Sequence, residues 1–119
     1  MAPKLFEAEL KIMDVLWKEG DLTAVELTKI MNKETGWTRS TTYTVLKKLI
    51  EKGAVERCKP KFTCRAVVTR EAVQQEEAEE LIDKLFGGSA ELFLSAYVSG
   101  KKLSDDEIAG LRRIVEELK

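Results

Sequence analysis

Residues 38–53 read TRSTTYTVLKKLIEKG, and this stretch decides the fold. Thr38 is a common residue type at helix N-caps and Gly53 suits the left-handed position after a helix, so the stretch predicts a helix over residues 39–52. On a wheel of about 100° per residue its side chains separate into two arcs. The mostly apolar arc, which we expect in the core, holds Thr42, Tyr43, Val45, Leu46, Leu49 and Ile50. The polar arc, which we expect to face outward, holds Ser40, Thr41, Thr44, Lys47, Lys48 and Glu51.

Two further helices are predicted before this one. Apolar residues at helical spacing indicate a first helix over residues 5–19, with Phe6 near its start and Gly20 after its end. The sequence Thr23-Ala-Val-Glu26 has the capping-box pattern and opens a predicted second helix over residues 24–33. The residues of this helix that we expect to face inward are Val25, Leu27, Ile30 and Met31.

A change of period follows the third helix. Residues 54–58 and 64–68 alternate with a period nearer two and predict two short strands, joined by a turn that contains Pro60. Three helices followed by a β-hairpin is the element order of a winged helix-turn-helix, in which the hairpin is the wing. The predicted fold class is therefore mostly α with a small β-hairpin wing.

The C-terminal part is predicted to be helical and to form a dimer. One helix is expected over residues 70–86, a short apolar helix capped by Ser89 runs through Val98, and a capping box at Ser104–Glu107 opens a last helix. Their apolar stripes have little else in the segment to pack on, so we expect a partner subunit to cover them, with packing inside one chain as the alternative. The expected interface residues are Leu85, Phe86, Leu92, Phe93, Tyr97, Ile108, Leu111 and Val115. We divide the chain into a winged-helix DNA-binding domain over 1–69 and a helical dimerisation region over 70–119.

Composition excludes the usual enzyme classes. The 119 residues include no His, which removes the commonest general base and metal ligand. The G-x-S-x-G, P-loop and G-x-G-x-x-G patterns are absent too, so we expect neither an enzyme nor a cofactor site. No apolar run approaches the length of a membrane span, and two Cys without an export signal predict a reducing cytoplasm and no membrane partner.

Charge is divided unevenly along the chain. The formal net charge is −1, yet residues 33–65 carry nine cations against three acids, a net of +6, and residues 67–119 carry seven cations against twelve acids, a net of −5. A basic segment around the third helix and the hairpin is typical of a DNA-binding surface. The predicted DNA-contacting residues are Arg39, Ser40, Thr41, Thr44, Lys47 and Lys48 on the helix and Lys59 and Lys61 on the wing. A merely solvated helix face, or a winged-helix module that binds a protein, is the alternative.

The stretch from Trp37 to Gly53 resembles the penicillinase repressor family of bacterial regulators (BlaI/MecI/CopY-like). The family pattern W-[ST]-x-x-T-x-x-T-x-x-x-[RK]-L-x-x-K-G is matched at Trp37, Thr38, Thr41, Thr44, Lys48, Leu49, Lys52 and Gly53. Ala8-Glu9 with Leu16-Trp17 resembles the family's opening, and Phe86-Gly-Gly with Leu103–Ile108 resembles its dimerisation segment. The resemblance implies a homodimeric repressor that binds a palindromic operator in double-stranded DNA, with the third helix in the major groove.

Two departures from the family limit what the resemblance implies about induction. In the family's β-lactamase repressors, a sensor protease cuts an Asn-Phe bond in the fifth helix, but the matching stretch here is Leu92-Phe-Leu-Ser-Ala-Tyr97. The copper-responsive branch carries a C-terminal cluster of Cys that this chain lacks. Neither proteolytic induction of that kind nor that form of copper sensing is therefore expected.

Cys58 and Cys64 flank the predicted hairpin loop. We expect them to lie across from one another, close enough for a reversible disulfide or a two-thiolate Cu(I) site, which leaves a thiol- or metal-responsive regulator as an alternative. Two thiolates alone fall short of a structural zinc site, so no metal ligands are assigned, and ordinary strand packing is the simpler interpretation.

Overall fold

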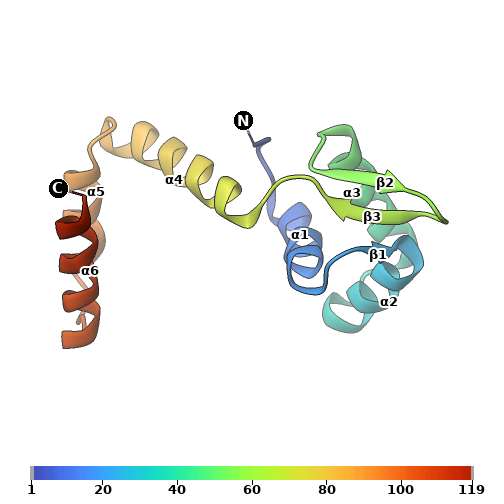
Figure 1. The fold of residues 1–119 in the computed structure, drawn as a ribbon, viewed down its shortest axis with the longest axis horizontal. Coiled ribbons are helices and arrows are strands. Elements are labelled where there is room, and N and C mark those ends of the chain that lie inside the picture. Colours follow the sequence, from blue (N-terminus) through green and yellow to red (C-terminus); the bar gives the residue numbers. More distant parts are fainter. Residues whose placement is uncertain (1, 119) are drawn as a thin grey trace. The chain divides into compact units, whose positions relative to one another are not determined.

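The computed structural model describes residues 2–118, which divide after Ala78 into two compact units (Figure 1). In chain order the elements are α1 (Glu7–Glu19), β1 (Leu22–Thr23), α2 (Ala24–Thr35), α3 (Arg39–Glu51), β2 (Val55–Cys58), β3 (Thr63–Ala66), α4 (Arg70–Phe86), α5 (Ala90–Val98) and α6 (Asp105–Glu117). The first unit has the winged helix-turn-helix order, so the predicted fold class is confirmed. The division at 69/70 into a DNA-binding and a dimerising region concerns function and stays a prediction.

Capping residues hold the helix-turn-helix in place. The Thr23 hydroxyl accepts from the Glu26 N–H at 3.1 Å, while the Thr23 N–H donates to Glu26 Oε1 at 2.9 Å, which completes the predicted capping box at the start of α2. Gly36 ends α2 in the left-handed conformation, with φ 77°. The Thr38 hydroxyl then accepts from the Thr41 N–H and starts α3 as predicted.

The first helix begins later than its apolar pattern indicates. Leu5 and Phe6 precede α1 instead of belonging to it, because the Phe6 N–H donates to Glu9 Oε1 at 2.8 Å and the backbone of Phe6 is extended. Leu5 is buried all the same, whereas the Phe6 side chain is 61% exposed. Residues 2–6, which we call the N-terminal strap, therefore contribute Leu5 to the core.

Val25 was predicted to face inward on α2, and this prediction is wrong. Its side chain is 48% exposed, because the buried face of α2 runs through Ala24, Leu27 and Met31 at spacings of three and four. Val25 lies about 100° around the helix from Ala24, which turns it out of that stripe.

The wing belongs to a three-stranded antiparallel sheet in the order β1-β3-β2. The predicted hairpin strands form over a shorter span, and β1 was not predicted at all. Leu22 and Thr23 pair with Cys64 and Thr63, and the Ala24 N–H donates to the Phe62 carbonyl at 2.7 Å. β1 therefore joins the wing to the start of α2.

A single core unites α1, α2, α3 and the sheet. Its largest fully buried side chains are Ile12, Met13, Leu27, Met31, Thr42, Leu46, Leu49, Val55 and Cys64. The start of α4 joins the same unit, since Val73 is buried and the Trp17 indole N–H donates to the Val68 carbonyl at 2.9 Å.

The second unit consists of the end of α4 with α5 and α6 (Figure 1). Of these helices, α5 and α6 lie side by side and line a common groove. Ser89 and Ser104 cap α5 and α6 as predicted. The Phe93 ring packs against Phe86 and Tyr97, at centroid distances of 5.6 and 5.9 Å. None of the residues 79–118 is buried. No helix within residues 2–118 is long and apolar enough to cross a membrane.

Candidate nucleic-acid interface

The two arcs of α3 lie as the wheel predicts. Thr42, Leu46 and Leu49 are buried and the rest of the apolar arc is half-buried, which fixes the helix against the core. Every residue of the polar arc is exposed: Ser40, Thr41, Thr44, Lys47, Lys48 and Glu51. The fold thus presents the predicted set of short hydroxyls and two lysines on one outward face.

The hydroxyls of α3 have distinct roles. The buried Thr42 donates to the Thr38 carbonyl at 3.1 Å, so this threonine is structural. The Thr44 hydroxyl donates to the Ser40 carbonyl at 2.9 Å, which leaves its oxygen lone pairs and its methyl group facing outward. The Thr41 hydroxyl accepts from that of Thr38 at 3.1 Å and keeps its own proton to donate. These exposed threonines offer the acceptor, donor and methyl groups that base edges in the major groove can use.

Arg39 stands at the exposed N-terminal end of α3. Its guanidinium carbon lies 5.3 Å from the centre of the Tyr43 ring, and that ring makes an edge contact with Phe62 of the wing at 6.0 Å. The N-terminal half of α3 and the turn of the wing are therefore joined by an aromatic contact.

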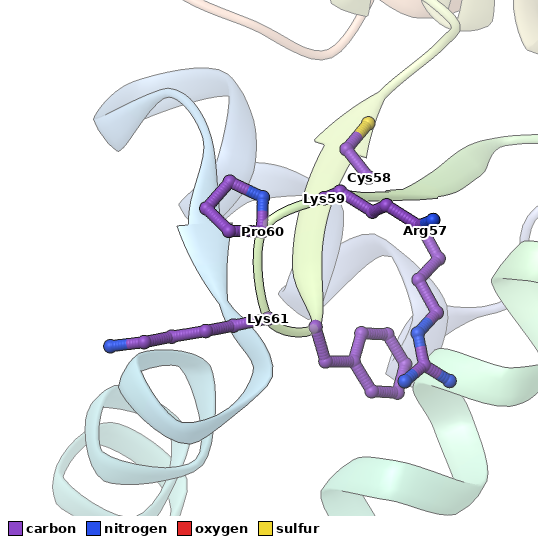
Figure 2. A pocket seen from close by; sticks show the side chains of 6 residues that line it. Arg57, Cys58, Lys59, Pro60 and Lys61 are labelled. Carbon is purple, nitrogen blue, oxygen red and sulfur yellow. The ribbon is translucent and has the colours of Figure 1, made fainter.

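The predicted wing cations are exposed at the hairpin tip. Lys61 has φ 58°, a left-handed conformation that costs roughly 1–2 kcal/mol for a residue with a Cβ. Its side chain extends toward the start of α2, on the opposite side of the tip from Arg57 (Figure 2). The backbone hydrogen bond from Thr23 lowers the pKa of Glu26 most, and the charge of Lys61 contributes. The positive charge of Lys61 thus also interacts with the Glu26 carboxylate of the protein itself.

Two cations of the basic segment are engaged inside the protein. Lys52 donates to Glu9 Oε1 at 2.6 Å and to the Lys4 carbonyl at 2.8 Å, and it lies 4.4 Å from the centre of the Phe6 ring. Arg65 forms an ion pair with Asp21 at 3.0 Å, and another with Glu56. Counting charges along the sequence includes both cations, although their partners come from distant or neighbouring segments that only the fold reveals.

Arg57 is one of the cations of the basic segment that the site prediction omitted. It is exposed on β2, and its guanidinium carbon lies 4.0 Å from the centre of the Phe62 ring. Its position two residues before the predicted turn was a usable signal, because it places a cation on the wing close to Lys59 and Lys61.

The expectation that Cys58 and Cys64 lie across from one another is wrong. Cys64 pairs with Arg57 and Cys58 pairs with Thr63, so the two cysteines point to opposite faces of the hairpin. Burial raises the pKa of the Cys64 thiol to about 11, and desolvation is also the main cause that raises the pKa of Cys58. Protonated thiols on opposite faces are suited neither to a disulfide nor to a shared Cu(I) ion.

Comparisons with known proteins agree with the winged-helix fold. A family model described as penicillinase repressor matches residues 5–117. The penicillinase repressor of Bacillus licheniformis is 27% identical over 119 residues, covering 98% of this chain and 93% of that protein. The solution structure of the DNA-binding domain of the repressor BlaI is 30% identical, with a TM-score of 0.55 over 59% of this chain and 88% of the other. A monomeric form of the Bacillus licheniformis BlaI in complex with the blaP half-operator is 29% identical, with a TM-score of 0.52 over 60% and 89%.

Proposed function

The chain belongs to the penicillinase repressor family, and from that membership we propose that it represses transcription as a homodimer bound to a palindromic operator in duplex DNA. α3 lies in the major groove, and the wing contacts the phosphate backbone. The observation that carries the proposal is the exposed arc of α3, which combines short hydroxyls with two lysines on a helix fixed by its opposite face.

The chemistry of the arc divides the work of binding. Thr41 and Thr44, with Ser40 beside them, are the right length for base edges and thymine methyls, while Arg39 at the start of the helix reaches a guanine or a phosphate. Lys47 and Lys48 lie further along the helix and neutralise phosphate, as do Lys59 and Lys61 on the wing. The complex of the similar BlaI with a half-operator supports binding of operator DNA by this fold.

The proposed dimer rests on the second unit. Residues 79–118 contain no buried side chain, yet they expose several large apolar ones, among them Leu85, Leu92 and Tyr97. An apolar groove runs between α5 and α6 and is lined by Phe93, Leu94, Tyr97, Val98, Leu103, Glu107, Gly110, Leu111 and Ile114. A second copy that covers these surfaces supplies the core that the unit lacks, and it sets two α3 helices to bind two half-sites.

Release from the operator is proposed to follow a route other than cleavage of an Asn-Phe bond. The chain has one asparagine, Asn32, and its side-chain amide donates to the Trp37 carbonyl at the turn before α3. The stretch Leu92–Tyr97 therefore offers no such bond to a sensor protease.

Selection from a pool of random duplexes tests the proposal. We expect the full chain to retain a palindromic sequence whose half-site centres lie about one helical turn, ~34–36 Å, apart. Lack of retention of any duplex at about 100 mM salt, where non-specific DNA binding is normally detectable, would contradict DNA binding and favour a protein partner. Enrichment of single half-sites without a palindrome would contradict the dimeric arrangement.

Substitutions on α3 and the wing separate base contacts from phosphate contacts. Thr44→Ala is expected to relax base preference, while Lys48→Ala weakens binding to all sequences and lowers the salt slope by about one unit. Lys61→Asn is the suitable wing variant, because asparagine tolerates the left-handed backbone, so the charged side chain is removed without added backbone strain. Titrations of the selected and a scrambled duplex at several salt concentrations measure both effects. Equal effects of Thr44→Ala and Lys48→Ala on the two duplexes would refute the assigned roles.

A further inference from the structure

The two faces of the wing differ in how their cations are paired. Glu56 lies opposite Arg65 in the sheet, and Arg65 also bonds Asp21, so the one arginine on this face is paired with two acids. On the other face Arg57 lies opposite the buried Cys64. Within residues 2–118, which the structure describes, no ion pair joins Arg57 to an acid. The wing therefore has one face whose arginine is paired with acids and one face with an available cation.

Arg57 is held in place by a ring and not by a carboxylate. Its guanidinium carbon lies 4.0 Å from the centre of the Phe62 ring, and Figure 2 shows the Arg57 side chain on the side of the tip away from Lys61. A guanidinium stacked on an aromatic face keeps its N–H donors at the edge of the plane, free to bind two oxygen atoms of a phosphate. The stacking orients the donors without using them.

A groove joins this face of the wing to α3. It is lined by Tyr43, Lys47, Ile50, Glu51, Arg57 and Phe62. Tyr43, Ile50 and Phe62 give it an apolar floor, and the Tyr43 and Phe62 rings meet edge to face at 6.0 Å. Two cations against one acid leave the rim with a net positive charge.

We propose that this groove seats one stretch of the DNA backbone, with a phosphate between Lys47 and Arg57 and the adjoining deoxyribose against the aromatic floor. The proposal rests on the proposed function and adds Arg57 as a contact residue and Phe62 as its positioning residue. Lys47 belongs both to the groove and to the polar arc of α3, so a duplex with α3 in its major groove passes along the same rim. This continuity identifies DNA, and not a small anion, as the occupant.

The test is a matched pair of charge removals, Arg57→Gln and Arg65→Gln, assayed on the selected operator from low to high salt. Arg57→Gln is expected to weaken binding about tenfold and to lower the salt slope by about one unit, because one phosphate contact is lost. Arg65→Gln removes the same charge from an arginine that is already paired with two acids, so the salt slope is expected to stay at the wild-type value. Equal slopes for wild type and Arg57→Gln would overturn the proposal.

Two further variants separate positioning from charge. Phe62→Leu keeps both cations but removes the ring under Arg57, so affinity is expected to fall about threefold with an unchanged salt slope; far-UV circular dichroism checks that the wing unit stays folded. Glu51→Gln removes the one acid of the rim and is expected to tighten binding to selected and scrambled duplexes alike, by about twofold to fivefold. A loss of slope in Phe62→Leu, or no gain in Glu51→Gln, would contradict the proposed arrangement.

The same titrations distinguish failure of this proposal from failure of the proposed function. A wild-type chain that retains no duplex refutes DNA binding itself. If the wild-type chain binds its operator and Arg57→Gln binds it equally well, only the proposed backbone contact is refuted. A chemical-shift titration with benzoate as a probe anion then tests the groove itself. Loss of benzoate binding in Arg57→Gln would assign the groove to a small anion.

Discussion

Replacing Lys52 by alanine is expected to lower the free energy of unfolding by about 3 kcal/mol, because it leaves the buried carboxylate of Glu9 without its cation. Glu9 is 3% exposed, and its Oε1 atom accepts from the Lys52 ammonium at 2.6 Å and from the Phe6 N–H at 2.8 Å. Among the residues that the structure describes, 2–118, buried Glu9 Oε2 has no hydrogen-bond partner, so the carboxylate depends on these two donors. Removing one member of a buried pair costs about 3–5 kcal/mol, and the lower end applies because the Lys52 side chain is 27% exposed.

Chemical denaturation of wild type, Lys52→Ala and Lys48→Ala measures this effect. Lys48 lies one turn earlier on α3 and is exposed, so Lys48→Ala is expected to change stability by no more than about 0.5 kcal/mol. The double variant Glu9→Gln with Lys52→Ala is expected to recover part of the loss, since it removes the uncompensated charge along with its partner. Losses of similar size in Lys48→Ala and Lys52→Ala would contradict the role assigned to the Glu9 pair.

Lys52 also shows where a cation count fails as a predictor of DNA contacts. Its ammonium binds the N-terminal strap through the Lys4 carbonyl and α1 through Glu9, so it is not available to phosphate. We therefore expect the effect of Lys52→Ala on stability to be accompanied by no change in the salt slope of the folded protein.

Local signals in the sequence predicted most of the fold because they act within a few residues. The Thr23–Glu26 capping box, the Thr38 cap and the period of α3 are each determined by neighbouring backbone groups, and each appears in the structure. β1 could not be predicted in this way, because two residues are too few to show alternation and their partners lie about forty positions away. The prediction that Val25 faces inward was wrong for a related reason, since apolar character alone does not identify which side of α2 meets the core.

The candidate site was predictable on α3 and less so on the wing. A helical wheel needs only sequence spacing, and it separates the exposed Thr44 and Lys47 from the buried Leu46 correctly. On the wing, the role of each charge depends on its cross-strand partner, which the register decides. Arg57 and Arg65 are both strand arginines, yet in the described part of the chain only Arg65 forms ion pairs with acids, Glu56 on β2 and Asp21.

A glutamate at Leu111 is expected to dissociate the proposed dimer and to weaken operator binding about a hundredfold. Leu111 is 37% exposed and lines the apolar groove between α5 and α6. A carboxylate there must be desolvated when a second copy covers the groove, and none of the described residues that line the groove is a cation. Each DNA-binding unit then binds its half-site alone, without the effective concentration that linkage to a second unit supplies.

Ala109→Glu is the matched control for this substitution. Ala109 is exposed on α6, and about 100° per residue puts it on the side of the helix away from the groove. Sedimentation equilibrium at micromolar concentration is expected to show a dimer for wild type and Ala109→Glu and a monomer for Leu111→Glu. On an isolated half-site all three are expected to bind equally, because the first unit is unchanged, so the loss appears only on the palindrome. A wild-type monomer at that concentration, or a Leu111→Glu variant that binds the palindrome as wild type does, would show that the apolar face of residues 79–118 serves another purpose.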